Sequence, residues 1–209
     1  MALPSHTGLA PVSRRGNRTR RELVKAARHV FERDGFLEAR ITDIAAQAGV
    51  ASGSFYTYFR RKEDAFAAVM EELGEEMLHP RLRDVADRDD PIAVIEASNR
   101  AYLIAYRRNA KLMGLMEQVA QIDPQFRQLR LKRARAFTAR NARALKQLQE
   151  RGLADKHLDP RLAATALSSM VSRTAYLRYV QGLGTESLDA LVTTLTQLWA
   201  GALGMNHRR

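Results

Sequence analysis

The sequence predicts an all-α protein in which a small three-helix module precedes a larger helical bundle, with about nine helices in total. Apolar residues recur at the three- and four-residue spacing of amphipathic helices from residue 19 almost to the C-terminal end. No segment alternates polar and apolar residues as a strand does, and no repeat of about 20–50 residues is found. Gly, Pro and Asp mark the breaks between the helical patterns.

The composition limits the class of protein. The chain has 209 residues, of which 45% are hydrophobic and 27% charged, as in a soluble globular protein. It contains no Cys, which excludes disulfides, thiolate metal sites and cysteine nucleophiles. No apolar run approaches the ~18 residues of a membrane span, and residues 1–21 lack the apolar core of a secretory signal. We therefore expect a cytoplasmic protein.

The positive charge is unevenly distributed. The formal net charge is +11, and residues 1–62 hold 12 Lys and Arg against 5 Asp and Glu. Residues 63–80 hold 6 acidic residues and no Lys or Arg. A basic N-terminal third suits a nucleic acid backbone, because neutralised phosphates release counterions. Many soluble proteins are basic for solubility alone, so the charge by itself favours nucleic acid only modestly.

Three helices are predicted near the N-terminus. An apolar stripe predicts a helix over residues 19–34, ended by Gly35. A second helix over residues 41–48 is broken by Gly49, and a third covers residues 52–59. The last two helices and their glycine turn predict a helix-turn-helix, and the final helix is rich in small polar and tyrosyl side chains. In that motif the second helix enters the major groove of DNA.

Residues 1–18 are polar, contain Gly and Pro, and predict a flexible arm. The basic segment Arg14–Arg21 is expected to be mobile. It either enters a narrow minor groove or adds only non-specific attraction to DNA, and the sequence leaves both possibilities open.

Beyond residue 62 every predicted element is a helix. A fourth helix over residues 62–79 begins with acidic residues, as the helix macrodipole prefers. Asp followed by Pro opens two later helices, at residues 123–124 and 159–160. After a polar connection at residues 80–91, helices are predicted over residues 91–108, 110–120, 124–151, 160 to about 182, and 185 or 186 onward.

Residues 35–66 carry a long, ordered motif. It consists of Gly35-Phe36, Asp43-Ile44-Ala45, Ala48-Gly49-Val50, Gly53-Ser54-Phe55-Tyr56, Phe59 and Lys62-Glu63. This motif resembles the TetR family of bacterial transcriptional regulators. The resemblance implies a DNA-binding domain over residues 19–64 and a helical effector-binding and dimerisation domain over residues 65–209.

The resemblance also implies a set of DNA contacts. Small side chains at Gly53 and Ser54 let the backbone approach base edges, and Ser54 and Thr57 can contact bases directly. Tyr56 and Tyr58 present hydroxyls to phosphates, although a packed core tyrosine is the alternative for Tyr56. The full set of expected DNA contacts is Arg40, Thr42, Ser52, Gly53, Ser54, Tyr56, Thr57, Tyr58 and Lys62.

Some of these positions depart from the family pattern. Arg40 stands where the family usually has Thr or Ser to cap the second helix, and an Arg can reach a phosphate but cannot cap N–H groups. Ala51 replaces a common Ser, so Ser52 is expected to cap the third helix. Lys62, together with the start of its helix, is expected to hold one phosphate. These departures leave the operator sequence open.

The larger domain is expected to sense a ligand. In the family a pocket between its helices changes the spacing of two DNA-binding modules, and half-sites about 34–36 Å apart require a fixed spacing. Ordinary core packing is the alternative for each pocket candidate. The candidates are Tyr102, Tyr106, Met113, Met116, Phe126, Phe137, Met170, Arg173 and Tyr176.

The predicted helix over residues 124–151 is unusually basic. It holds nine Lys and Arg and a single acidic residue, a pattern that is usually a solvated face. Arg130, Arg133 and Arg140 are predicted near Phe126 and Phe137. A mixed cationic and apolar wall suits an amphipathic anion such as a fatty acid or an acyl-coenzyme A.

The last two helices carry more apolar surface than a monomer comfortably exposes, which predicts a homodimer through them. Closure of the intramolecular core is the alternative use of the same residues. The sequence therefore predicts a ligand-responsive dimeric regulator. On the family resemblance it is a repressor that binds a palindromic operator in double-stranded DNA and is released by a small, largely apolar effector.

Other classes of protein fit less well. The five His are scattered, and no metal motif, phosphate loop or nucleophile elbow is present, so neither an enzyme nor a cofactor or metal is expected. An effector-independent architectural DNA-binding protein is the alternative function. A membrane-surface protein is disfavoured because the basic helices lack an exposed face rich in Trp and Phe.

Overall fold

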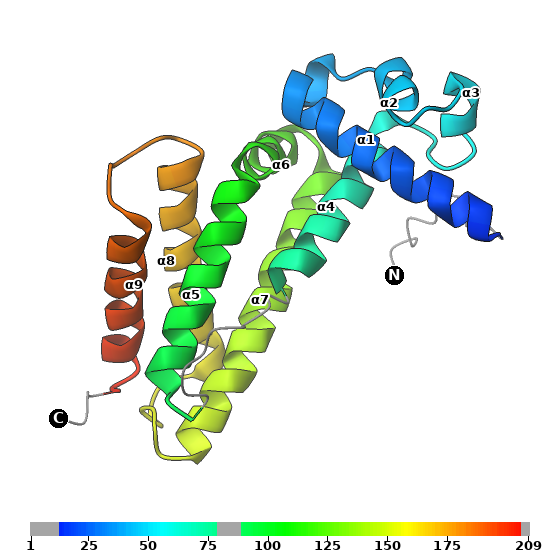
Figure 1. Cartoon of the computed structure of the whole chain (residues 1–209). Helices are drawn as coiled ribbons and strands as arrows, with labels where there is room; N and C mark the ends of the chain where they lie inside the picture. Colours follow the sequence, from blue (N-terminus) through cyan, green and yellow to red (C-terminus); the bar gives the residue numbers. More distant parts are fainter. Residues whose placement is uncertain (1–12, 79–88, 206–209) are drawn as a thin grey trace. The chain divides into compact units, whose positions relative to one another are not determined.

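The computed structural model describes residues 13–78 and 89–205, and every regular element in these ranges is a helix (Figure 1). The nine helices of the described residues confirm the predicted all-α class. None of them is long and apolar enough to cross a bilayer. The helices are α1 Arg14–Glu38, α2 Ile41–Gln47, α3 Ser52–Phe55, α4 Lys62–Leu78, α5 Pro91–Arg108, α6 Ala110–Ile122, α7 Pro124–Glu150, α8 Pro160–Tyr179 and α9 Leu188–Ala202.

The chain divides into two compact units. The first comprises Met1–Glu75 and Leu115–Arg127, and the second comprises Glu76–Gly114 and Gln128–Arg209. The helices α4, α6 and α7 each contribute residues to both units. The predicted functional division at residue 64 remains a prediction.

The helix α1 begins five residues earlier than predicted, so the expected flexible arm is wrong for residues 14–18. The side chain of Ser13 accepts a hydrogen bond from the Gly16 N–H at 3.1 Å and caps the helix. Once a buried apolar stripe has nucleated a helix, added polar residues extend it at little cost. Gly35, at a φ of +79°, interrupts α1 as predicted, and one further turn follows it. The remainder of the predicted arm, residues 1–12, lies outside the described residues.

The helix α3 is shorter than predicted and ends at Phe55 rather than Phe59. The chain continues in tighter turns, in which the Thr57 N–H donates to the Ser54 carbonyl at 3.3 Å and the Tyr58 N–H to the Phe55 carbonyl at 2.9 Å. Such three-residue bonds commonly tighten the end of a helix. Phe55 and Phe59 are both buried, and the turns keep the residues between them at the surface.

The core of the first unit is aromatic. The ring of Phe66 lies 5.0 Å from that of Phe31 and 5.1 Å from that of Phe36. Phe126, in the first turn of α7, lies 5.2 Å from Phe66 and 6.0 Å from Phe36. Aromatic pairs at these separations add about 0.5–1.5 kcal/mol each to the free energy of area burial. The junction of α6 and α7 is therefore part of the same core as α1 and α4.

The second unit is a bundle in which α5 packs against both α8 and α9 (Figure 1). Asn99 of α5 donates to the hydroxyl of Thr196 of α9 at 3.2 Å, and both side chains are buried. The predicted Asp-Pro helix starts are confirmed. Asp159 accepts from the Leu162 N–H at 2.7 Å, and Asp123 accepts from the Gln125 N–H at 2.8 Å.

Candidate DNA-binding surface and effector site

The helix-turn-helix packs through apolar residues and leaves polar residues outside. Ile44 and Phe55 are fully buried, which fixes α2 against α3. Gly49 turns the chain between them at a φ of +68°, a conformation that side chains other than Gly rarely adopt. The Val50 N–H then donates to the Ala45 carbonyl at 3.0 Å and closes the turn. This arrangement turns the polar face of α3 toward solvent.

Most of the residues expected to contact DNA are exposed. Tyr56 has 54% of its area exposed, so it is not the packed core tyrosine that the sequence left as an alternative. Ser54, Tyr58 and Lys62 are half-buried. The exposed members of the expected set are Arg40, Thr42, Ser52, Gly53, Tyr56 and Thr57.

Gly53 has no role in packing within the chain. Its φ is not positive, and a Cβ built on it would meet no atom within 4 Å. Gly inside a helix is destabilising by about 1 kcal/mol relative to Ala. Among the residues that the structure describes, neither backbone strain nor crowding explains a Gly at this position.

The caps of the two short helices differ in part from expectation. Arg40 is the N-cap of α2 and makes no side-chain capping bond, as predicted for an Arg. Ala51, not Ser52, is the N-cap of α3, and no side-chain capping bond is present there. The expectation that Ser52 caps α3 is therefore wrong. Because Ser52 already has helical geometry, its hydroxyl is not in the position from which a cap accepts.

Lys62 makes intramolecular contacts that the sequence did not indicate. Its Nζ donates to the carbonyls of Leu37 at 2.7 Å and Ala39 at 3.2 Å, and lies 5.1 Å from the centre of the Phe36 ring. These contacts join the first residue of α4 to the last turn of α1 and to its C-cap residue, Ala39. The predicted phosphate contact of Lys62 remains a prediction.

Other functional contacts also escaped sequence reasoning. The guanidinium of Arg20 lies 5.3 Å from the centre of the Phe59 ring, and Arg61 donates to Gln125 at 2.7 Å. An exposed basic stripe also runs along α1, at a spacing of three and four residues. Had the helix been predicted from residue 14, this spacing would have revealed the stripe. It comprises Arg14, Arg18, Arg21 and Lys25.

Some of the predicted pocket residues come together in the second unit. The ring of Tyr102 lies 5.8 Å from that of Tyr106 and 5.7 Å from that of Phe137. Nη2 of Arg133 lies 3.7 Å from the sulfur of Met113. Arg133 and Phe137 are four residues apart and so lie on the same face of α7. This cluster combines aromatic and thioether groups with cationic ones.

Other predicted pocket residues lie elsewhere. Phe126 and Met116 belong to the first unit, where Phe126 completes the aromatic core. The helical spacing of α7 correctly relates residues 126 and 137, but spacing alone cannot show that the first turn packs against α1 and α4. Arg173 is exposed, with its guanidinium 5.1 Å from the ring centre of Tyr176 on the same helix, and Met170 is half-buried on α8.

The basic face of α7 is only partly turned inward. Arg130 is exposed, whereas Arg133 and Arg140 are half-buried. Burial lowers the pKa of the Arg140 guanidinium, which remains a cation because arginine titrates far above neutral pH. The side chain of Asn141 accepts from Arg140 at 3.2 Å and donates to Ser168 of α8 at 2.9 Å.

Comparison with known proteins agrees with this geometry. Residues 23–69 match the family model of the tetR family of bacterial regulatory proteins. The chain is 28% identical over 99 residues to the fatty acid metabolism regulator protein of Bacillus subtilis (strain 168), covering 46% of this chain and 50% of that relative. Its fold resembles that of the fatty acid degradation regulator FadR from Bacillus halodurans, with a TM-score of 0.72, 22% identity, and coverage of 87% of this chain and 97% of that chain.

A second solved structure has the same architecture. It is SmeT, the repressor of the Stenotrophomonas maltophilia multidrug efflux pump SmeDEF, with a TM-score of 0.67, 22% identity, and coverage of 88% of this chain and 89% of that chain. The chain spans half the length of the curated relative from B. subtilis that it matches.

Residues 23–69 thus match the sequence of a DNA-binding domain of bacterial regulatory proteins, and they lie within an all-helical fold. The DNA-binding domain of the chain is that of the TetR family, and the described residues have the TetR-family fold. The resemblance inferred from the motif at residues 35–66 is confirmed.

Proposed function

We propose that the protein is a transcriptional repressor that binds a palindromic operator as a homodimer and is released by an acyl effector with an anionic head. The DNA-binding role is supported mainly by the polar, exposed surface of α3 around Gly53. Among the described residues, no atom lies close enough to Gly53 to require a glycine there. An operator search with selected oligonucleotides should recover a palindromic duplex. An architectural protein would instead bind generic DNA with similar affinity and show no ligand-dependent release.

The substitution Gly53→Ala tests the role of the open space at α3. The fold accommodates the added methyl group, so the free energy of unfolding should stay the same or rise by up to about 1 kcal/mol. Operator affinity should fall, because the methyl group stands where a base edge or phosphate approaches. Chemical denaturation and fluorescence anisotropy on the same preparation separate the two effects. An unchanged operator affinity in the folded variant would contradict the proposed surface.

The homodimer is supported by apolar side chains that remain exposed on the last two helices. Leu198 of α9 has half of its area exposed, and Leu162 of α8 has 69%. Other residues of the predicted interface, among them Leu195 and Trp199, are buried within the chain, so the proposed contact uses the outward residues. Analytical ultracentrifugation at micromolar concentration should give a dimer. A protein that is entirely monomeric at this concentration would contradict the proposed binding to two half-sites.

The acyl effector is supported by two independent observations. In the second unit Arg140 lies beside Phe137, which contacts Tyr102, and Arg133 lies beside Met113, which combines cationic with apolar groups. The B. subtilis relative is named for fatty acid metabolism and the B. halodurans neighbour for fatty acid degradation. Dodecanoate or dodecanoyl-coenzyme A should release the protein from its operator. Operator binding that neither ligand affects would contradict the effector while leaving the DNA-binding role intact.

A further inference from the structure

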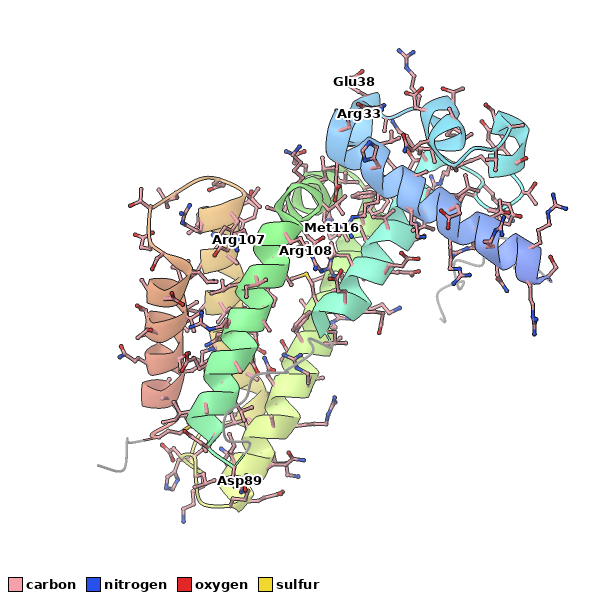
Figure 2. The ribbon with its side chains drawn as sticks, in the orientation of Figure 1. Arg33, Glu38, Asp89, Arg107, Arg108 and Met116 are labelled. Carbon is pink, nitrogen blue, oxygen red and sulfur yellow. The ribbon has the colours of Figure 1, made fainter. Side chains whose placement is uncertain are left out.

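The outer face of α7 holds a row of cations that belong neither to the core nor to the proposed effector site. Figure 2 shows side chains that end in nitrogen projecting from the outer side of this helix. Residues of this face recur at a spacing of three and four, and all are exposed, at positions 128, 132, 135, 139, 143, 146 and 150. We call its four cations the α7 stripe, which consists of Lys132, Arg135, Arg143 and Lys146.

The α7 stripe differs from cations elsewhere in the chain. Lys25, Arg61 and Arg100 each pair with an acidic residue one helical turn away, at 3.1, 3.6 and 3.4 Å. In contrast, the sequence has no acidic residue between positions 124 and 149. Lys146 lies 4.0 Å from Glu150, and both side chains are mostly exposed, so this pair is weak. The helix therefore presents a face of a single sign of charge along most of its length.

Neighbours within the stripe repel each other. Lys132 and Arg135 are three residues apart, as are Arg143 and Lys146, so like charges stand next to each other one turn apart. Such pairs destabilise an isolated helix, whereas pairs of opposite sign stabilise it. A bound polyanion would remove this repulsion and would gain from all four charges at once.

The spacing of the stripe matches the backbone of duplex DNA. Arg135 and Arg143 are eight residues apart, which is about 12 Å along the helix axis. The major groove of B-DNA is also about 12 Å wide. The two pairs of cations can therefore reach phosphates of the two strands that border one groove. Between the pairs the exposed residue is Ala139, whose small side chain lets the helix approach.

Duplex DNA fits this face better than a membrane or a protein does. A helix on a bilayer buries Trp, Phe or Leu. The centre of a protein interface is poor in charge and contains aromatic or aliphatic anchors. Besides its charged residues, the face of α7 has only Gln128 and Ala139. Phosphate contacts require only long cationic or polar side chains, so the phosphate backbone is the partner that this face suits.

We propose that the α7 stripe binds the phosphate backbone of duplex DNA of any sequence. The stripe lies wholly within the second unit, which thus has a DNA contact of its own. The inference goes beyond the proposed repressor function, which assigns DNA recognition to the helix-turn-helix alone. Each neutralised phosphate releases counterions, so the affinity that the stripe contributes should fall steeply as salt rises.

The test measures the affinity of the full-length protein for a non-operator duplex by fluorescence anisotropy, between about 50 and 200 mM salt. The stripe variant combines Lys132→Gln, Arg135→Gln, Arg143→Gln and Lys146→Gln. If all four cations neutralise phosphates, the slope of log affinity against log salt should decrease by about 3.6. Because the four side chains are exposed, the variant should unfold at the same temperature as the wild-type protein.

A matched control removes the same charge from other surfaces of the second unit. It replaces two Arg and two Lys by Gln, and all four are exposed. One of them, Arg107, lies near the end of α5 (Figure 2). The control residues are Arg107, Lys111, Lys156 and Arg161. The control should keep the wild-type slope, and an equal decrease in both variants would reduce the effect to net charge and overturn the proposal.

Two double variants keep the test valid should the fourfold variant not fold. Lys132→Gln with Arg135→Gln, and Arg143→Gln with Lys146→Gln, should each decrease the slope by about 1.8. Wild-type slopes in both double variants would overturn the proposal. Vesicles of phosphatidylglycerol and phosphatidylcholine provide a further arm. Loss of vesicle binding with an unchanged DNA slope would assign the stripe to a membrane and overturn the contact with DNA.

The outcomes separate this inference from the proposed function. A stripe variant that keeps its preference for the operator but loses salt dependence supports both. A wild-type protein that prefers no operator, and whose salt dependence still falls in the stripe variant, overturns the repressor and leaves the stripe standing. A wild-type slope in the stripe variant, with operator preference intact, overturns the stripe alone.

Discussion

Single residues in this chain have uses that differ from those their motif implies. Lys62 belongs to the family motif as an expected phosphate contact, yet its ammonium donates to the carbonyl of Leu37 in the last turn of α1 and to that of Ala39, which follows α1. Ala39 immediately precedes Arg40, the N-cap of α2. Lys62 therefore positions the start of the helix-turn-helix, whether or not it also reaches DNA.

We expect Lys62→Met to lower the free energy of unfolding by about 1.5–3 kcal/mol, the range for hydrogen bonds to a charged group. Lys25→Met is the matched control. Lys25 is exposed and pairs with Glu22 alone among the described residues, so its loss should change stability by less than about 0.5 kcal/mol. Denaturant unfolding of both variants checks the difference. Equal stabilities would show that the contacts of Lys62 contribute nothing.

Variants of two neighbouring residues should distinguish contacts to phosphates, which position the protein on DNA, from contacts to bases, which read the sequence. Tyr56→Phe removes an exposed hydroxyl expected to contact phosphate and should weaken binding to all duplexes alike. Thr57→Ala should alter the base preference at one position of each half-site, by about 1–3 kcal/mol in binding free energy. Binding of both variants to a library of single-base operator variants provides the measurement. A changed base preference in Tyr56→Phe would assign the tyrosine to readout instead.

Among the elements, α1 differs most from its prediction. The sequence between residues 14 and 18 has no apolar stripe, so periodicity could not extend the helix there, and Gly16 suggested flexibility. The cap by Ser13 depends on a single hydrogen bond, which is visible only once the helix is built. In contrast, the starts of α7 and α8 follow from Asp-Pro pairs whose effects are local, and these were predicted correctly.

The basic stripe of α1 gives a prediction for DNA affinity. Replacing Arg14, Arg18 and Arg21 by Gln should lower the affinity for operator and non-operator duplexes by the same factor. If all three neutralise phosphates, the slope of log affinity against log salt should decrease by about 2.7. Anisotropy titrations between about 50 and 200 mM salt measure this slope. An unchanged slope would mean that the stripe faces solvent in the complex.

Two helical glycines should respond oppositely to the same substitution. A Cβ on Gly114 of α6 would lie 2.9 Å from Cγ1 of Val180, whereas a Cβ on Gly201 of α9 would meet no atom within 4 Å. Gly201→Ala should therefore raise the free energy of unfolding by up to about 1 kcal/mol through helix propensity. Gly114→Ala should lower it, because overpacking in a core typically costs about 1–3 kcal/mol. Thermal unfolding of both variants measures these opposite changes in stability. A Gly114→Ala variant more stable than the wild-type protein would contradict the close contact between Gly114 and Val180.

At the scale of the whole molecule, the sequence predicted the fold class and the DNA-binding motif, whereas the structure groups only some of the residues predicted for the effector pocket. Helix periodicity and a long motif are local signals, and both identified their elements. The grouping of Tyr102 with Phe137, and the separation of Phe126 from both, depend on contacts between helices distant in sequence. No spacing rule within one helix contains that information, so the sequence could not place Phe126 in the aromatic core of the first unit.

The oligomeric state gives a prediction for the assembled protein. Leu198→Glu places a charge on the exposed apolar face of α9, so it should shift a dimer toward monomer and weaken binding to a two-half-site operator. Binding to a single half-site should change little. Ile122→Glu is the control, since Ile122 is an exposed apolar residue outside α8 and α9. Sedimentation velocity measures the oligomeric state, and anisotropy measures operator binding. A Leu198→Glu variant that remained a dimer would contradict the proposed interface.

The aromatic core of the first unit limits how this regulator can be re-engineered. A chimera that fuses residues 13–78 to the sensor of another regulator would lose Phe126 and expose Phe36 and Phe66, which now pack against it. A graft that also carries residues 115–127 keeps the aromatic interior complete. The transferable cassette is therefore discontinuous in sequence, and a domain swap with one crossover point should give an insoluble or inactive product.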